Sequence, residues 1–232
     1  GTASASTQQV DALLAGTTWA QVTPSAAVPA ITTTALTAFG NVCTGTTAGP
    51  NSFTINGTNL TTANVTVGAL AGYTYSTAAG GPYTSTLSLT QPGGTYSQQI
   101  FVQFSPTLVQ AYNGNIPVAG GGVSAAVNVA ASGSGVNTIP TVTTGGASGV
   151  TQTTATLAGS IPGTGCTAIS AYGVEYSTTA GFPNGTGTPV PSSNLSGGNF
   201  TSALSGLAPT TTYYYHAWAT NAGGTAYGAE QS

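Results

Sequence analysis

The sequence predicts an all-β protein of two tandem β-sandwiches that follow an N-terminal extension. Three observations lead to this fold class. Short runs of β-branched and aromatic residues recur between clusters of Gly, Pro and Asn along most of the chain. The strong helix formers Glu, Lys, Arg and Met are nearly missing, so a helical alternative has little support. A length of 232 residues favours two domains of ordinary size over a single one.

Residues 1–28 differ from the rest and form the predicted N-terminal extension. Gln8–Ala15 has apolar residues at helical spacing, whereas Trp19–Val22 favours a short strand. Pro24 and Pro29 then end the segment. We therefore expect this stretch to lie outside the first sandwich.

Residues 29–135 are predicted to form the first sandwich. Alternation of apolar and polar residues is clearest in Thr86–Thr90 and Ile100–Phe104, as expected for strands with one face in a core. Several short strands at this spacing are typical of an all-β sandwich. The expected strands are Ile31–Phe39, Ser52–Asn56, Asn64–Val67, Tyr73–Ser76, Thr86–Thr90, Gln99–Phe104, Gly114–Val118 and Val123–Ala130.

Residues 136–232 are predicted to form the second sandwich. A short Gly/Ser link, Ser132–Asn137, marks the boundary, and Pro140 begins the next unit. Gly181–Gly198 is rich in turn residues. The expected strands are Thr141–Thr144, Thr153–Ser160, Ser170–Ser177, Asn199–Leu204, Thr211–Thr220 and Thr225–Glu230.

Charged residues make up 1% of the chain, and there is no Lys or Arg. Without cations the chain cannot neutralise phosphate groups, which argues against nucleic acid and acidic lipid surfaces as partners. A net charge of only −3 leaves little repulsion between copies, so self-association is favoured. No stretch of about 18 consecutive apolar residues exists, so membrane insertion is not expected.

The two cysteines, Cys43 and Cys166, lie one in each predicted sandwich. Their separation fits neither a zinc site nor a redox motif of two nearby cysteines. An oxidising extracellular setting favours a disulfide, and two buried thiols are the alternative. The bond would join the two cysteines across the domain junction, or each to the equivalent cysteine of a neighbouring molecule. The former requires Cα atoms within about 7 Å of each other.

The second sandwich carries a recognisable set of segments. They are Thr153–Leu157, Tyr172–Tyr176 and Leu204–Asn221. These segments resemble the B strand, the C strand, and the E–F corner with the F strand of a fibronectin type III domain. The resemblance covers roughly residues 139–230. It implies structural roles for Leu207, Pro209 and Tyr213, with the Tyr213 hydroxyl bonded back to the corner backbone.

Five segments of the first sandwich carry a second resemblance: Ala38–Cys43, Asn51–Leu60, Leu89–Gly94, Gln99–Pro106 and Asn113–Asn115. They are similar to an immunoglobulin-like repeat of large surface and secreted proteins of bacteria that use type IX secretion. This similarity implies adhesion, spacing or surface coating rather than a reaction. It also implies a location outside the cell or on the cell surface of a bacterium.

The chain offers no evident catalytic set, because it has one histidine, two distant cysteines and three scattered acids. Only one Asp is present, so no calcium-binding loop of the Asp-rich kind exists. We therefore expect no enzyme activity, no metal and no cofactor. Glu175 and His216 would be neighbours on the implied C and F strands. A surface pair joined by a salt bridge or hydrogen bond is the expected arrangement there.

Tyr214, His216 and Trp218 are the most informative predicted surface residues. Alternation places the residues between them in the core, so these three face outward on the same side as Glu175. Exposed aromatic side chains with polar tips are typical of interfaces and of platforms on which sugars stack. We expect them to line a contact surface with a protein. Cover by a loop or by the first domain, and sugar binding, are the alternatives.

Two functional hypotheses follow. In the first, the chain is a structural subunit of an extracellular filament or surface layer, whose main partner is itself. In the second, it is an adhesive, spacer or carbohydrate-binding module of a larger secreted surface protein, and surface glycans are the partner.

A specific mode of self-assembly accompanies the first hypothesis. The last expected strand stops short at Ala229–Ser232, which would leave an open sheet edge. Residues 1–28 of a neighbouring subunit would pair with that edge, with Trp19, Val22 and Val28 filling pockets. Such head-to-tail contact does not close on itself and generates filaments.

Overall fold

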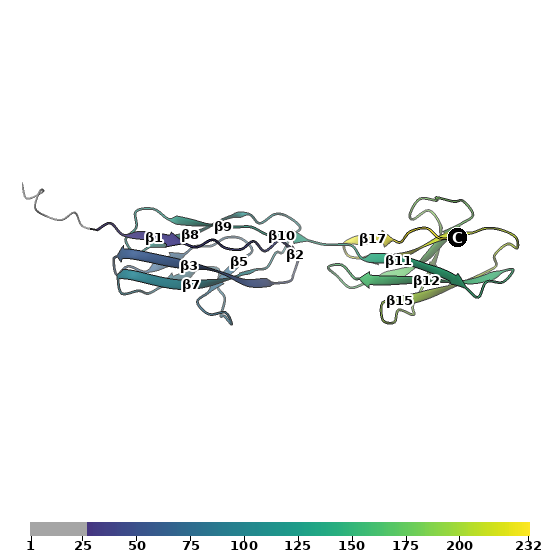
Figure 1. The fold of residues 1–232 in the computed structure, drawn as a ribbon, viewed down its shortest axis with the longest axis horizontal. Helices are drawn as coiled ribbons and strands as arrows, with labels where there is room; N and C mark the ends of the chain where they lie inside the picture. The colour runs from purple at the N-terminus through teal and green to yellow at the C-terminus, as the bar shows by residue number, and fades with distance from the viewer. Residues whose placement is uncertain (1–26) are drawn as a thin grey trace, which may run out of the picture.

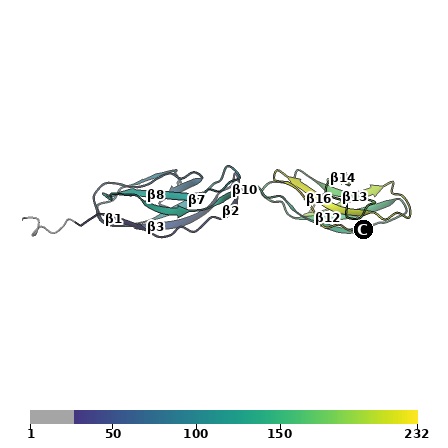
Figure 2. The same cartoon turned by 90° about the horizontal axis from the view of Figure 1, so that it is seen from above.

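The computed structural model describes residues 27–232, which form two β-sandwiches placed end to end along the molecule (Figures 1 and 2). Every regular element in this range is a β-strand. The expected helical segment Gln8–Ala15 and the expected strand Trp19–Val22 lie outside the described residues. Residues 27–232 contain no helix that could cross a bilayer.

The first sandwich has two main sheets that enclose one core. One sheet consists, in spatial order, of β1 (Ala30–Thr33), β3 (Ala48–Leu60), β7 (Gly94–Phe104) and β5 (Tyr73–Ser76). The other consists of β6 (Leu87–Leu89), β4 (Val65–Val67), β8 (Gly114–Gly120) and β9 (Val127–Ala131). Neighbouring strands within both sheets are antiparallel.

Alternation along the long strands builds the first core. In β7, Ile100, Val102 and Phe104 are fully buried, whereas the residues between them are partly exposed. β3 presents Phe53 directly opposite Ile100, and Ile55 follows two residues later on the same face. An aromatic cluster extends this core through the rings of Phe39, Tyr73, Phe104 and Tyr112.

The second sandwich has a sheet of three strands packed on a sheet of four. The smaller one is β11 (Thr141–Ser148), β12 (Thr154–Gly163) and β15 (Asn199–Ser205). The larger one is β14 (Thr188–Pro191), β13 (Ala171–Ser177), β16 (Tyr214–Asn221) and β17 (Gly224–Tyr227). The core of this sandwich shares no residue with the first core. Two separate antiparallel sandwiches of this kind are immunoglobulin-like and fibronectin type III-like, so the predicted fold class is confirmed.

The segment Ser132–Asn137, which was expected to be a short Gly/Ser link, belongs largely to the first sandwich. Its residues form β10 (Ser134–Val136), which pairs in parallel with β2 (Asn41–Cys43) of the first sandwich. The glycines serve close packing, because a Cβ on Gly135 would overlap the carbonyl of Leu108. The first sandwich therefore extends to Val136, and the connection to β11 is shorter than expected.

The segment after β17 stays paired with β16. The expectation of an open sheet edge at the end of the chain is therefore wrong. After β17, the Gly228 N–H donates to the carbonyl of Ala217, 2.9 Å away. Gln231 then exchanges two backbone hydrogen bonds with Tyr215. The segment that follows β17 therefore continues to pair with β16, and the proposed pairing site for residues 1–28 is already occupied.

Two buried tyrosines of β5 provide a matched test of the first core. The Tyr73 hydroxyl donates to the carbonyl of Tyr112 at 2.9 Å. The Tyr75 hydroxyl is buried without a partner among the described residues, although the Leu70 backbone lies close by. We expect Tyr75→Phe to raise the free energy of unfolding by about 1 kcal/mol, since it removes an unpaired polar group. Tyr73→Phe should lower it by about 1 kcal/mol.

Urea unfolding followed by circular dichroism measures both changes. A Tyr75→Phe variant that is destabilised as much as Tyr73→Phe would contradict the assignment of an unpaired hydroxyl.

Stability should also fall at alkaline pH. Burial raises the pKa of Tyr73 from 10.0 to about 12 and raises the pKa of Tyr75 as well. Because each folded-state pKa exceeds the unfolded one, the unfolded chain releases its protons first. The stabilisation is complete below pH 10 and is lost as the pH rises from 10 through the folded-state values. Urea midpoints measured over this range should decline, and less steeply in Tyr75→Phe; a flat profile would refute the sign.

Candidate functional site

Glu175 and His216 form a buried pair on the outer face of the four-stranded sheet. They lie directly opposite each other on β13 and β16. His216 Nε2 bonds to Glu175 Oε1, and only 2% of His216 and 3% of Glu175 is exposed. Polar side chains withdrawn from water in this way need further hydrogen bonds to be tolerated.

The loop 178–187, between β13 and β14, supplies that bond and covers the pair. The Gly185 N–H donates to Glu175 Oε1 at 2.7 Å, and the ring of Phe182 stacks on His216 with centroids 4.5 Å apart. At the start of the loop, the Gly181 N–H donates to the Glu230 carboxylate at 2.9 Å. Glu175, His216 and Glu230 are the only acidic or histidine side chains in residues 27–232, and all three hold this loop.

The expectation that Tyr214, His216 and Trp218 are all exposed is wrong. The alternation itself is as expected, because Tyr215 and the alanines that follow it in β16 point into the core. The opposite face is covered by the loop and by Tyr227, whose ring meets His216 edge-on. His216 is therefore buried, and Tyr214 and Trp218 are only partly exposed. Cover by a loop, one of the alternatives, accounts for this face.

The imidazole of His216 is shielded from solvent. Phe182 and Tyr227 enclose the imidazole, so no substrate reaches it. Within residues 27–232, no three His, Cys, Asp or Glu side chains gather as metal ligands would. Glu175 and His216 were expected to form a surface pair, but both are buried and hold the loop 178–187 against the sheet. The other expected contact residues, Trp19 and Val22, lie outside the described residues.

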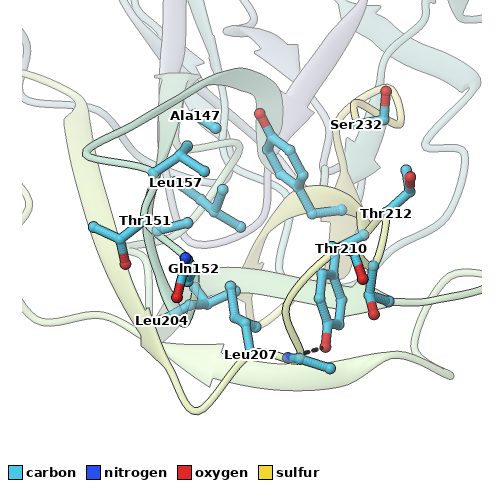
Figure 3. Close-up of a pocket in the computed structure, with 15 residues that line it drawn as sticks. Ala147, Thr151, Gln152, Leu157, Leu204, Leu207, Thr210, Thr212 and Ser232 are labelled. Carbon is cyan, nitrogen blue, oxygen red and sulfur yellow. Dashed lines mark hydrogen bonds between the residues drawn. The ribbon is translucent and has the colours of Figure 1, made fainter.

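The corner residues occupy the positions that the fibronectin type III resemblance implies. The Tyr213 hydroxyl accepts the N–H of Ala208 at 2.9 Å (Figure 3). The Leu207 N–H donates to the carbonyl of Thr153, and the Pro209 carbonyl accepts the hydroxyls of the two threonines that follow it. This corner closes the end of the sandwich that lies away from the linker.

A pocket of about 470 Å³ opens at this distal end (Figure 3). It lies between the two sheets, where β11 and β15 end and β12 and β16 begin. Aliphatic side chains form one part of its wall, namely Ala147, Ala155, Leu157, Leu204 and Leu207, and threonine and tyrosine side chains form much of the rest. Val150, which is 68% exposed, stands at its rim. The pocket lacks convergent charged groups and is suited to an apolar occupant.

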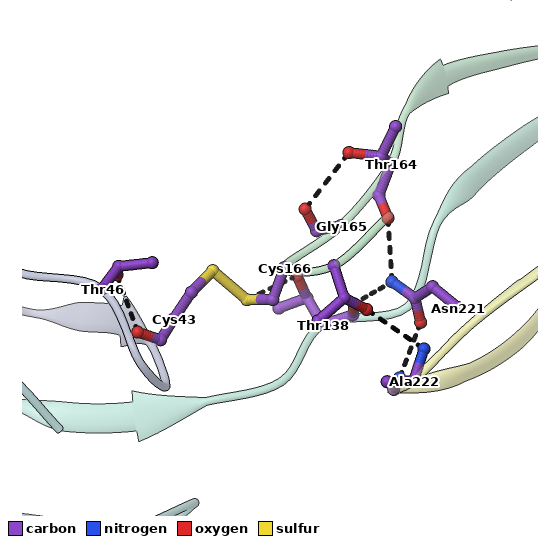
Figure 4. The surroundings of a disulfide bond; sticks show 10 residues. Cys43, Thr46, Thr138, Thr164, Gly165, Cys166, Asn221 and Ala222 are labelled. Carbon is purple, nitrogen blue, oxygen red and sulfur yellow. Dashed lines mark hydrogen bonds between the residues drawn. A yellow bond between two sulfur atoms is a disulfide. The ribbon is translucent and has the colours of Figure 1, made fainter. Parts of the chain in front are cut away.

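The two sandwiches are joined by a disulfide between Cys43 and Cys166 (Figure 4). Their Cα atoms are 5.4 Å apart, so the first of the two expected pairings is the one observed. Cys43 ends β2, where it lies opposite Val136 of β10. The bond therefore starts beside the point at which the chain leaves the first sandwich.

Asn221 fixes the other end of this bond. Its buried amide donates to the carbonyls of Thr138 and Thr164, and its oxygen accepts the Gly223 N–H (Figure 4). The Cys166 N–H donates to the same Thr138 carbonyl at 3.2 Å. Gly165, at φ +72°, is required here, since a Cβ would overlap Thr138 and Asn221. Linker residue Thr138 is thus held against the loop that carries Cys166.

Neither Phe182 nor Asn221 was a candidate from the sequence. Phe182 is a lone aromatic residue in a turn-rich stretch, and Asn221 is one of many asparagines. Only the fold brings them to the loop and the linker.

Replacing both cysteines by serine should release the relative orientation of the sandwiches. The bond closes a loop with a sequence separation of 123 residues, so its loss should also cost about 5 kcal/mol of stability. Small-angle X-ray scattering should show a broader distribution of shapes for the Cys43→Ser, Cys166→Ser variant than for the oxidised chain. Identical distributions would mean that the hydrogen bonds of Asn221 alone fix the junction.

No protein-family model and no curated protein matches the chain. Three similar solved structures are the FN1–FN3 domains of chicken CNTN1, the titin domains Z1Z2 in complex with telethonin, and the titin I-band fragment I67–I69. Their sequence identities are 16%, 14% and 13%, and the TM-scores are 0.30, 0.40 and 0.30.

The matches cover 84%, 88% and 88% of this chain, and 66%, 95% and 64% of those structures. The chain thus spans about two thirds of the CNTN1 and I-band fragments. Likenesses at this level carry no argument about function, and the assignment to immunoglobulin-like and fibronectin type III-like sandwiches rests on the two cores and their strand orders.

Proposed function

We propose that the chain is a structural subunit of an extracellular filament or surface layer of a bacterium, and that copies associate end to end. The observation that carries this proposal is the disulfide-fixed junction, which makes two sandwiches into one rod. A module that only needed to be tethered would require neither the Cys43–Cys166 bond nor the amide of Asn221 at the junction.

The two ends of the rod differ in a way that supports head-to-tail contact. The apolar pocket lies at the distal end of the second sandwich, with Val150 at its rim. β1, which follows residues 1–28 in the sequence, lies at the opposite end of the molecule (Figure 1). Because the edge of β16 is already paired, this pocket replaces the sheet edge as the receptor in our proposal. Trp19 and Val22 of the next copy are the apolar side chains proposed to fill it.

The near absence of charge also supports association. Residues 27–232 hold three acidic or histidine side chains, and all of them are engaged by the loop 178–187. The rest of the surface carries hydroxyl and amide groups, which do not repel a second copy. The disulfide agrees with an oxidising location outside the cytosol.

A spacer or adhesive module of a larger surface protein is the second candidate. The same rod supports it, since a fixed length and orientation are what a spacer provides. The two functions differ in solution, because a spacer stays monomeric at all concentrations.

Assembly is tested by light scattering and negative-stain microscopy over a concentration series. We expect the intact chain to form linear assemblies. Deletion of residues 1–26 should abolish them, and so should Val150→Glu, which places a charge at the pocket rim. Val109→Glu is the matched control, because Val109 is 66% exposed but belongs to the first sandwich.

An intact chain that remains monomeric throughout would favour the spacer. Linear assemblies that persist in both the deletion and Val150→Glu would show that the contact lies elsewhere.

A further inference from the structure

A second, smaller pocket of about 270 Å³ lies on the outer face of the four-stranded sheet, beside the covered pair. Its floor comes from two cross-strand pairs of β16 and β17, Trp218 with Tyr227 and Thr220 with Thr225. Glu175, Gly185, Gly187 and Pro189 also line the pocket. Unlike the distal pocket, this one combines aromatic surface with several polar groups.

Only one of the two carboxylate oxygens of Glu175 accepts hydrogen bonds from the protein. Its Oε1 accepts hydrogen bonds from His216 Nε2 and the Gly185 N–H. Its Oε2 has no protein partner among the described residues, although the side chain lines the pocket. A carboxylate oxygen can accept two hydrogen bonds, so this atom is suited to bind hydroxyl donors.

The facing residues offer the complementary groups. The Thr220 and Thr225 hydroxyls bond to each other at 2.8 Å, which leaves one of their two protons free to donate. The indole N–H of Trp218 is buried without a partner in residues 27–232. An unpaired buried donor in a native fold is a sign of a missing water or ligand. Tyr227 adds a second aromatic ring beside the indole.

The loop 178–187 holds this arrangement in place. Phe182 against His216, Gly185 against Glu175, and Gly181 against Glu230 fix the loop at three points. The acceptor is therefore positioned before any ligand arrives, which reduces the ordering cost of binding.

The charge of the pocket selects among polar ligands. No Lys or Arg exists to bind an anionic group, and Glu175 would repel one. The same carboxylate is already bonded to the imidazole of His216. What remains is a neutral molecule with adjacent hydroxyls and an apolar face.

We infer that this pocket binds one neutral pyranose unit of a glycan, with hydroxyls on Glu175 Oε2 and the Thr220–Thr225 pair and a face of the sugar ring on Trp218 and Tyr227. The volume accommodates a single unit rather than a chain. This inference does not rest on the proposed end-to-end assembly, because the pocket is on the side of the second sandwich.

The indole N–H signal of Trp218, which lines the pocket, reports sugar binding directly. The chain has two tryptophans, so the full-length Trp19→Phe variant retains a single indole N–H. Two-dimensional ¹H–¹⁵N NMR follows that signal while the methyl glycosides of glucose, galactose, mannose and N-acetylglucosamine are added separately. We expect at least one to shift the indole signal saturably, with a Kd of about 1 mM for so small a ligand.

Two threonine variants provide the matched comparison. In the Trp19→Phe background, Thr225→Val removes a pocket hydroxyl and should weaken binding about five-fold. Thr58→Val removes an exposed strand hydroxyl from the first sandwich and should leave the Kd unchanged. Glucuronate, the anionic analogue, should bind at least ten-fold more weakly than glucose.

Three results would overturn the inference: no saturable shift with any of the four glycosides, an equal Kd for Thr225→Val, or glucuronate binding as well as the neutral sugars. A saturable shift in the Trp19→Phe variant, together with an intact chain that stays monomeric over its concentration series, would support the pocket while rejecting end-to-end assembly, so the two proposals fail separately.

Discussion

The architecture depends on how the junction between the sandwiches is held. Each sandwich has its own core, so neither needs the other in order to fold. The connection could therefore have been a free hinge, as is the default between small domains. Instead, Cys43 is placed beside the end of the first sandwich by the β2–β10 pair, and Cys166 is placed beside linker residue Thr138 by Asn221. The disulfide between these two positioned cysteines fixes the orientation of one sandwich relative to the other.

This chain has no Lys or Arg side chains to bond its buried backbone carbonyls, and amide and hydroxyl side chains make these hydrogen bonds instead. Asn221 binds three backbone groups at the junction, and buried Gln91 binds the carbonyls of Thr61 and Ala63 in the first sandwich. Such neutral groups are satisfied without the desolvation penalty of a charge. The Glu175–His216 pair is the exception, and it stands where a glycine-rich loop has few other means of attachment.

The sequence predicted the features that are encoded in local patterns of residues. The strand series, the inward residues of β16 and the bond of Tyr213 to the corner all follow from alternation or from a short motif. The sequence could not show β10, because Ser134–Val136 has the composition of a linker and its glycines are explained only by neighbours far away in the chain. β14 was hidden by its two prolines, which an edge strand tolerates. The cover over His216 was missed since one Phe among turn residues gives no periodic signal.

The disulfide has a mechanical consequence. Under tension from the two ends of the molecule, load passes along the chain into β10 and, in parallel, through the sulfur atoms into Cys166. The segment between the cysteines, with a sequence separation of 123, is bypassed by the covalent path. Even if both sandwiches unravelled, about 400 Å of contour length would stay locked inside that closed loop. Only the residues before Cys43 and after Cys166 could then extend, so the rod would lengthen by much less than the same chain without the bond.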